Sequence, residues 1–184
     1  MRQILCFAIL AGFLMSCDVK TNVKRTNDEL PEDEPANKAQ IAMMLDSFNA
    51  TAARADYSGY FTHFADNANT VFIGTDATEH WTKKEFMDWA KPYFDRGRVW
   101  KFTALGRNIY SRKESPGIAW FDELLNTSMK ICRGSGVVVK EDGRWKVQQY
   151  VLSITVPNSL ADSVVAIKTT DENKIIDSLT KKGR

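Results

Sequence analysis

The segment at residues 137–147, VVVKEDGRWKV, constrains the fold more than any other part of the chain. Its two apolar runs flank Glu141-Asp142-Gly143, which suits a three-residue hairpin loop with glycine in the left-handed position. Such a loop fixes the register, so Val139 faces Trp145 and the pairing continues residue by residue down both strands. Because few side chains beside the turn are polar, we expect the hairpin to cover a core or to enclose a cavity.

This register assigns the hairpin side chains to two surfaces. The first surface carries Ile131, Arg133, Ser135, Val137, Val139, Trp145, Val147, Gln149, Val151 and Ser153. The second carries Cys132, Gly134, Gly136, Val138, Gln148, Tyr150, Leu152 and Ile154. The first is apolar near the tip and polar toward its far end, which is typical of a small-molecule pocket. The second is rather apolar for a solvent-facing surface, so we expect a homodimer interface that includes Cys132, Tyr150 and Leu152.

The preceding strand admits two registers. A two-residue turn at Asn126-Thr127 pairs Glu123 with Lys130, whereas a three-residue loop would turn Phe121 and Glu123 toward the pocket. The matched opposite charges favour the two-residue turn. In that register the pocket surface also carries Trp120, Asp122 and Leu124.

Residues 39–158 form one domain in which helices precede a sheet. Apolar residues recur at helical spacing over 41–55 and 60–64, a brief strand covers 70–74, and Thr82 and Glu85 form a capping box that opens a third helix. After Gly97 the period changes to two, which predicts strands at 99–112, 117–125, 129–140 and 145–156. This order is typical of an α+β domain whose curved antiparallel sheet wraps around N-terminal helices. Apolar clusters in the tail, 159–184, indicate one or two short helices.

The first residues predict a leader and a membrane anchor. One arginine precedes an uncharged run that ends in Leu14-Met15-Ser16-Cys17, which looks like a bacterial lipobox. Residues 1–16 are therefore expected to be a lipoprotein signal peptide, and lipidated Cys17 to anchor the chain outside the cytoplasm, in the periplasm or at the outer membrane. The polar segment 17–38 is expected to be a disordered tether. A net charge of +2 without a basic stripe argues against nucleic-acid binding.

Three segments together resemble the SnoaL-like branch of the nuclear transport factor 2 superfamily. They are FIGTDATEHWTKKEF, AWFDELL and RGSGVVVKEDGRWKVQQYVLSITVPN, and the resemblance covers about 39–158. It implies a cone-shaped α+β barrel, also known as a cystatin-like roll, with a deep pocket at its open end. Members include isomerases, cyclases, dehydratases, binding proteins and oligomerisation modules, so the fold does not name a function. Many relatives carry a histidine on the last strand, where this chain has Gln149 to Leu152.

These observations define the candidate site. The ligand-pocket candidates are Trp81, Trp120, Asp122, Arg133, Gln149 and Ser153. Asp122 is the candidate general base, because apolar walls would raise its pKa, but Arg133 could hold it as an ion pair or could itself bind a ligand carboxylate. Trp81 should rim the pocket. No cofactor is expected, and His63-Asp66 and Glu79-His80 lack a defined metal-ligand spacing.

Three functions remain open from the sequence. The first is a lipid-anchored domain that binds a small, largely apolar molecule without transforming it. The second is an isomerase, cyclase or dehydratase that uses Asp122 as its base. The third is a non-catalytic homodimeric interaction module. Cys132, expected to be the one thiol left after processing, has no neighbouring base and is interpreted as structural.

Overall fold

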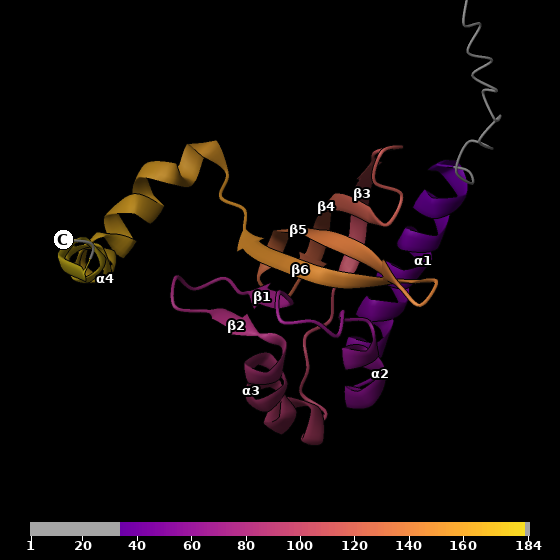
Figure 1. Cartoon of the computed structure of the whole chain (residues 1–184). Helices are drawn as coiled ribbons and strands as arrows, with labels where there is room; N and C mark the ends of the chain where they lie inside the picture. The colour runs from indigo at the N-terminus through magenta and orange to yellow at the C-terminus, as the bar shows by residue number, and fades with distance from the viewer. Residues whose placement is uncertain (1–33, 183–184) are drawn as a thin grey trace, which may run out of the picture. The chain divides into compact units, whose positions relative to one another are not determined.

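The computed structural model describes residues 34–182 (Figure 1). The expected signal peptide, Cys17 and most of the expected tether lie outside the described residues. In chain order the elements are α1 (Glu34–Ala53), α2 (Tyr57–Thr62), β1 (Val71–Ile73), β2 (His80–Thr82), α3 (Lys83–Asp95), β3 (Thr103–Ser111), β4 (Ile118–Thr127), β5 (Lys130–Glu141), β6 (Arg144–Ile154), the 3-10 turn η1 (Asn158–Leu160) and α4 (Ala161–Lys182). Residues 34–38, expected in the tether, thus belong to α1. None of the helices described is both long and apolar enough to traverse a bilayer.

All six strands form one sheet in the order β2-β1-β6-β5-β4-β3. Strands β3 to β6 make an antiparallel meander, as expected, and β1 adds to β6 in parallel. We call the face that packs on α1, α2 and α3 the inner face, and the opposite one the outer face. The α+β class and the curved sheet around the helices are confirmed. The tail is a single long helix, α4, whose side chains are mostly exposed.

The β5–β6 hairpin differs from the expected register in two ways. Its turn has two residues, Asp142 and Gly143, and not the three that were expected. Both adopt the left-handed conformation that this tight turn requires, with φ values of 50° and 75°. The ladder then shifts again between Val137 and Val138, where Gln148 is the extra residue of a β-bulge. Beyond the bulge, the second shift brings Arg133 and Ser135 back to the same face as Gln149 and Ser153, as expected. Between turn and bulge, Trp145 and Val147 therefore lie on the inner face, not beside Gln149 as expected.

The β4–β5 turn has two residues, as expected, but lies at 128–129, so Thr127 pairs with Lys130. Glu123 consequently pairs with Gly134, and the expected pair with Lys130 is wrong. Trp120, Asp122 and Leu124 still share a face with Arg133, as expected. The pairing is displaced by an even number of residues, and side chains alternate between the two faces.

The assignment of the two surfaces was inverted. Cys132, Tyr150 and Leu152, expected at a solvent-facing dimer interface, are buried on the inner face among the aromatic side chains of the helices. Tyr150 packs against Phe48 and stacks on Phe72, with ring centroids 5.5 Å apart in each pair. The helices pack on the face that carries Gly134 and Gly136, where the missing side chains leave room for aromatic rings. Cys132 is a buried free thiol, in agreement with a structural role.

Gly134 illustrates that room. A Cβ atom at Gly134 would lie 2.5 Å from the hydroxyl oxygen of Tyr150 and 3.1 Å from Glu123. The hydroxyl of Tyr150 lies over Gly134, although the backbone partner of Tyr150 is Gly136.

Candidate functional site

The expected pocket residues of the sheet lie on the outer face. Trp120, Asp122, Arg133, Gln149 and Ser153 share that face, as predicted, but it is turned away from the helices. The carboxylate of Asp122 accepts hydrogen bonds from Asn108 Nδ2 at 3.2 Å and from the Tyr110 hydroxyl at 3.1 Å, and it lies 3.7 Å from Arg133 Nη1. Asp122 therefore belongs to a polar cluster on the sheet surface, and it cannot act as a base inside the cone.

Trp81 is the one pocket candidate that lines a cavity at the helix side of the sheet. The cavity, which we call the tryptophan cleft, has a volume of about 200 Å³. It is lined by Phe72, Gly74, Thr75, Glu79, Trp81, Phe86, Trp89, Trp100, Phe102, Met129 and Leu152. One water needs roughly 10–15 Å³ by this kind of measure. The cleft thus has room for a small molecule, although the deep pocket that the resemblance implies is largely filled by side chains.

The walls of the cleft are stacked aromatic rings. Trp81 lies 4.8 Å from Trp89 and 5.7 Å from Phe86, with interplanar angles of 29° and 21°. Trp100 continues the array, 5.8 Å from Phe86 at 23°. Phe86 in turn stacks on Phe72 at 3.9 Å and 9°. Because these rings are nearly parallel, the exposed end of the stack suits another flat, apolar group.

The capping box at Thr82 and Glu85 positions these rings. Thr82 and Glu85 make both hydrogen bonds of the box, so α3 begins where the sequence predicts. Trp81 precedes the cap and Phe86 follows at the fourth helical position, which is the spacing of a hydrophobic staple. The staple is a local sequence signal for the position of Trp81. It predicts that Trp81 folds back onto α3, next to Trp89.

Glu79 is the one ionisable side chain among the residues that line the tryptophan cleft. Its Oε2 atom accepts a hydrogen bond from the backbone N–H of Asp76 at 3.1 Å. A Cβ atom at Gly74 would lie 2.1 Å from that oxygen, so glycine there leaves space for the carboxylate. A positively charged or hydrogen-bond-donating group on a ligand could interact with it.

A second ionisable group lies inside the cone. Glu123 is fully buried, and burial raises its pKa, opposed by the nearby guanidinium of Arg107. Glu123 Oε2 accepts a hydrogen bond from Arg107 Nε at 2.8 Å, and Arg107 Nη2 lies 2.8 Å from the same oxygen as an ion-pair contact without hydrogen-bond geometry. The rejected β4 register had turned Phe121 and Glu123 toward the pocket, and both do face inward. Because Glu123 is enclosed by side chains, its role is structural.

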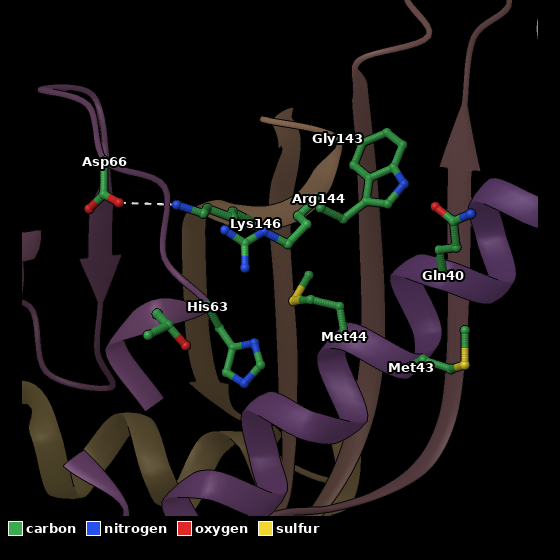
Figure 2. Close-up of a pocket in the computed structure, with 10 residues that line it drawn as sticks. Gln40, Met43, Met44, His63, Asp66, Gly143, Arg144 and Lys146 are labelled. Carbon is green, nitrogen blue, oxygen red and sulfur yellow. Dashed lines mark hydrogen bonds and ion pairs between the residues drawn. The ribbon is translucent and has the colours of Figure 1, made fainter. Parts of the chain in front are cut away.

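A larger cavity lies between α1, the end of α2 and the β5–β6 turn (Figure 2). It has a volume of about 570 Å³. Its lining residues are Gln40, Met43, Met44, Thr62, His63, Asp66, Gly143, Arg144, Trp145 and Lys146. We call it the hairpin-tip cavity. It shares no lining residue with the tryptophan cleft.

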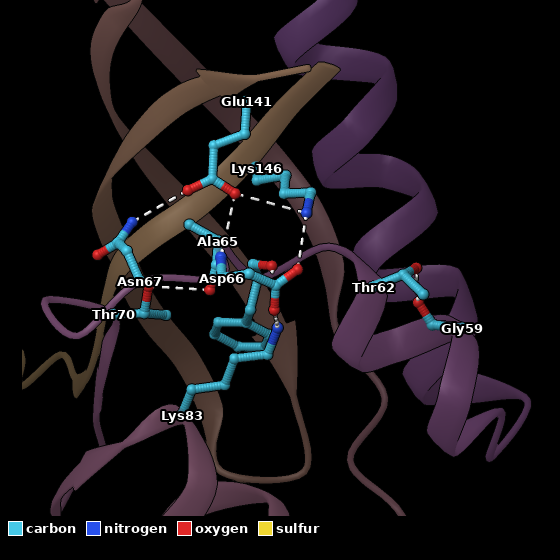
Figure 3. Close-up of polar contacts among 10 residues, drawn as sticks. Gly59, Thr62, Ala65, Asp66, Asn67, Thr70, Lys83, Glu141 and Lys146 are labelled. Carbon is cyan, nitrogen blue, oxygen red and sulfur yellow. Dashed lines mark hydrogen bonds and ion pairs between the residues drawn. The ribbon is translucent and has the colours of Figure 1, made fainter. Parts of the chain in front are cut away.

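Polar contacts hold one edge of the hairpin-tip cavity in place (Figure 3). Asp66 bonds to Lys83 and to Lys146, the latter at 3.0 Å. Glu141 accepts from the backbone N–H of Asp66 and from Asn67 Nδ2, each at 3.0 Å. These bonds lower the pKa values of Asp66 and Glu141. Among residues 34–182, no three His, Cys, Asp or Glu side chains gather as metal ligands, so His63 and Asp66 stay separate features.

Comparisons with known proteins agree with this architecture. A family model described as a SnoaL-like domain matches residues 41–157. No curated protein matches the sequence. A cystatin-like domain of unknown function from Nostoc punctiforme PCC 73102 has a TM-score of 0.56 and 16% identity, over 81% of this chain and 99% of that one. An NTF2-like protein of unknown function from Pseudomonas putida KT2440 has a TM-score of 0.56 and 11% identity, over 67% and 89%. At such identities the structural likeness shows the fold alone.

Proposed function

The chain belongs to the family of SnoaL-like domains, and from that membership we propose that it binds a small, largely apolar molecule in the tryptophan cleft. The observation that carries the proposal is the set of nearly parallel rings of Trp81, Trp89 and Trp100, left partly uncovered at the cone side of the sheet. A ligand with a flat ring can extend this stack and bury its apolar surface there.

Binding without chemical conversion is supported by the make-up of the cleft. Proton transfer needs a group within hydrogen-bond reach of the reacting atom, and a partner to return the proton. Glu79 is the only ionisable side chain among the described lining residues, and it has no acid or base partner in the lining. The enzyme alternative built on Asp122 is not pursued, since Asp122 lies on the outer face.

Mass spectrometry of the native protein tests this proposal. The purified chain is incubated with a metabolite extract, washed, and compared with a Trp89→Ala variant for ligands that remain bound. We expect at least one small aromatic or apolar compound with the wild type and a strong loss with the variant. Retention of the same compounds by both proteins would show that they bind elsewhere.

A homodimer is a second proposal, and the exposed apolar side chains of the outer face favour it. Trp120, Leu124 and Ile131 are all exposed there. Trp120 stacks on Tyr110 with the ring centroids 6.0 Å apart at 16°, so two aromatic rings lie side by side on this surface. An apolar surface of this kind fits a second copy better than it fits water.

Membrane attachment is proposed from the sequence of residues 1–17. Acylation of Cys17 would hold the domain outside the cytoplasm. Metabolic labelling with palmitate tests this: we expect incorporation into the wild-type protein and none into Cys17→Ser. Equal labelling of both proteins would overturn the proposal.

A further inference from the structure

We infer that the hairpin-tip cavity is a separate binding site for a small organic anion with an apolar body. Its volume of about 570 Å³ lies within the roughly 300–1,000 Å³ of ligand pockets. The inference does not rest on the tryptophan cleft, because the two cavities have no lining residue in common.

The charges of the lining favour an anion. Asp66 and Lys146 neutralise each other, with Nζ of Lys146 3.0 Å from Oδ2 of Asp66. The side chain of Arg144 has no hydrogen-bond or ion-pair partner within the described part of the chain, and the residue is exposed. Figure 2 shows its guanidinium group turned over the space above Met44 and His63, while the ammonium group of Lys146 is turned toward Asp66. A guanidinium group with free donors is suited to a carboxylate or phosphate.

His63 adds a polar wall without adding charge. Its Nε2 atom lies 3.2 Å from Ser47 Oγ, and burial lowers the pKa of the imidazole below its ordinary value. The imidazole is therefore neutral at pH 7, and Arg144 carries the unbalanced positive charge of the cavity. The His63 carbonyl accepts from the N–H of Val147 at 2.7 Å, which fixes this wall to β6.

Trp145 forms part of the cavity wall. It is 6% exposed and lines the cavity, and its indole N–H is buried without an acceptor among residues 34–182. Because the nitrogen atom itself is out of reach of solvent, the N–H serves as a reporter of the cavity wall and not as a contact for the ligand.

Apolar side chains make up another part of the lining, beside the polar Gln40 and Thr62. Met43 and Met44 contribute flexible thioether side chains from α1, and the Trp145 ring closes the wall from β6. Methionine adapts to ligands of different shape. A bare inorganic anion would leave this surface unused, whereas a carboxylate or phosphate joined to a short apolar group would cover it.

The experiment uses hexanoate as the probe, with hexanol and hexylammonium as uncharged and cationic comparators. The indole N–H signal of Trp145 is followed by NMR and assigned through its absence in Trp145→Phe. We expect a saturable shift with hexanoate only, and an affinity at least about tenfold lower in Arg144→Gln, as for the loss of one charge-assisted hydrogen bond. Arg98→Gln removes an exposed arginine outside the cavity and is expected to bind like the wild type.

Two kinds of outcome would overturn the assignment. One is an equal response to hexanol or hexylammonium, or none to any probe, which would exclude an anion site. The other is hexanoate binding that Arg144→Gln leaves undiminished. Because Arg144 is exposed, its replacement should not unfold the protein, and a thermal melt of each variant verifies this.

Discussion

The hydroxyl oxygen of Tyr150 lies 3.1 Å from Oε1 of Glu123, and both side chains are buried on the inner face of the sheet. The other carboxylate oxygen of Glu123 is bonded to Arg107, whose Nη1 atom reaches the carbonyl of Ala42 at 3.1 Å and Asp46 at 2.8 Å in α1. This series of contacts ties α1 to β3, β4 and β6 through the interior. Hydrogen bonds are electrostatically stronger in a buried network than in water, and a buried group that loses its partner there is costly.

Replacement of Tyr150 by phenylalanine should therefore be costly. It removes one oxygen and leaves Glu123 Oε1 without its donor, so we expect unfolding in urea to show a loss of about 1–3 kcal/mol. Tyr110→Phe is the matched control, since Tyr110 donates to Asp122 at the same distance of 3.1 Å on the outer face. We expect no measurable change there, because water replaces the lost bond. Equal effects of the two substitutions would contradict the structural role of the buried pair.

Gly134→Ala tests the space that this pair requires. The added methyl group would lie 2.5 Å from the Tyr150 hydroxyl oxygen, so the ring must move or the hydrogen bond must break. Overpacking of a core costs about 1–3 kcal/mol, and we expect a lower melting temperature. Gly106→Ala, also in a strand, meets nothing within 4 Å and should leave the melting temperature unchanged or slightly raised. If Gly134→Ala melted at the same temperature as the wild type, the space around Gly134 would be less tightly packed than the structure indicates.

The sequence predicts the elements of this core better than its faces. The capping box of Thr82 and Glu85 and the change of period after Gly97 depend on local chemistry, and α3 and the four long strands form as expected. The bulge at Gln148 depends on how the sheet curves around the helices, which no local pattern encodes. The charge match of Glu123 with Lys130 was misleading, because a buried arginine on the neighbouring strand is its partner.

In the candidate site, too, the features set by local sequence were predicted correctly and those set by packing of the whole domain were not. Trp81 was identified as a cavity residue because its position beside the α3 cap is local. Asp122 and Arg133 were correctly placed together, since alternation along strands fixes which residues share a face. Which of the two faces meets the helices depends on packing across the whole core, where Phe121 and Tyr150 join the aromatic side chains of the helices.

Acid should weaken the contacts around Asp66. Hydrogen bonds from Lys83 and then Lys146 lower the pKa of Asp66, so its contribution to stability is present above the ordinary carboxyl pKa and is lost as the pH falls through the lowered value. We expect Asp66→Asn to lose about 1 kcal/mol at pH 7, after screening by solvent, and the difference from wild type to vanish in strong acid. Urea unfolding at several pH values measures this difference.

Asp95→Asn is the control for that series. Asp95 pairs with a single lysine, Lys91, which is 55% exposed, whereas the two lysines that pair with Asp66 are 19% and 14% exposed, so we expect no measurable loss at any pH. A deficit of Asp66→Asn that grows as the pH falls would have the wrong sign for a lowered pKa and would refute the explanation.

Two leucine variants separate dimerisation from folding. Leu124 is exposed on the outer face, so Leu124→Glu should yield a folded monomer by light scattering if that face joins two copies. Leu152 is 6% exposed on the inner face, and Leu152→Glu should fail to fold, because a carboxylate would be buried in the core without a partner. A wild-type protein that is already monomeric would contradict the proposed homodimer.

Two tryptophans of nearly equal exposure test the tryptophan cleft. Trp89 is 38% exposed and lines the cleft, whereas Trp120 is 39% exposed on the outer face. Base-sized rings stacked on an aromatic side chain lose about 1–3 kcal/mol of binding when that side chain is replaced by alanine. We therefore expect Trp89→Ala to lower the affinity for a ligand recovered from the wild-type protein at least about tenfold by calorimetry, the equivalent of ~1.4 kcal/mol. Trp120→Ala should leave this affinity unchanged. Because the two substitutions remove the same ring from equally exposed positions, a larger effect of Trp120→Ala would move the binding site to the outer face and end the case for the cleft.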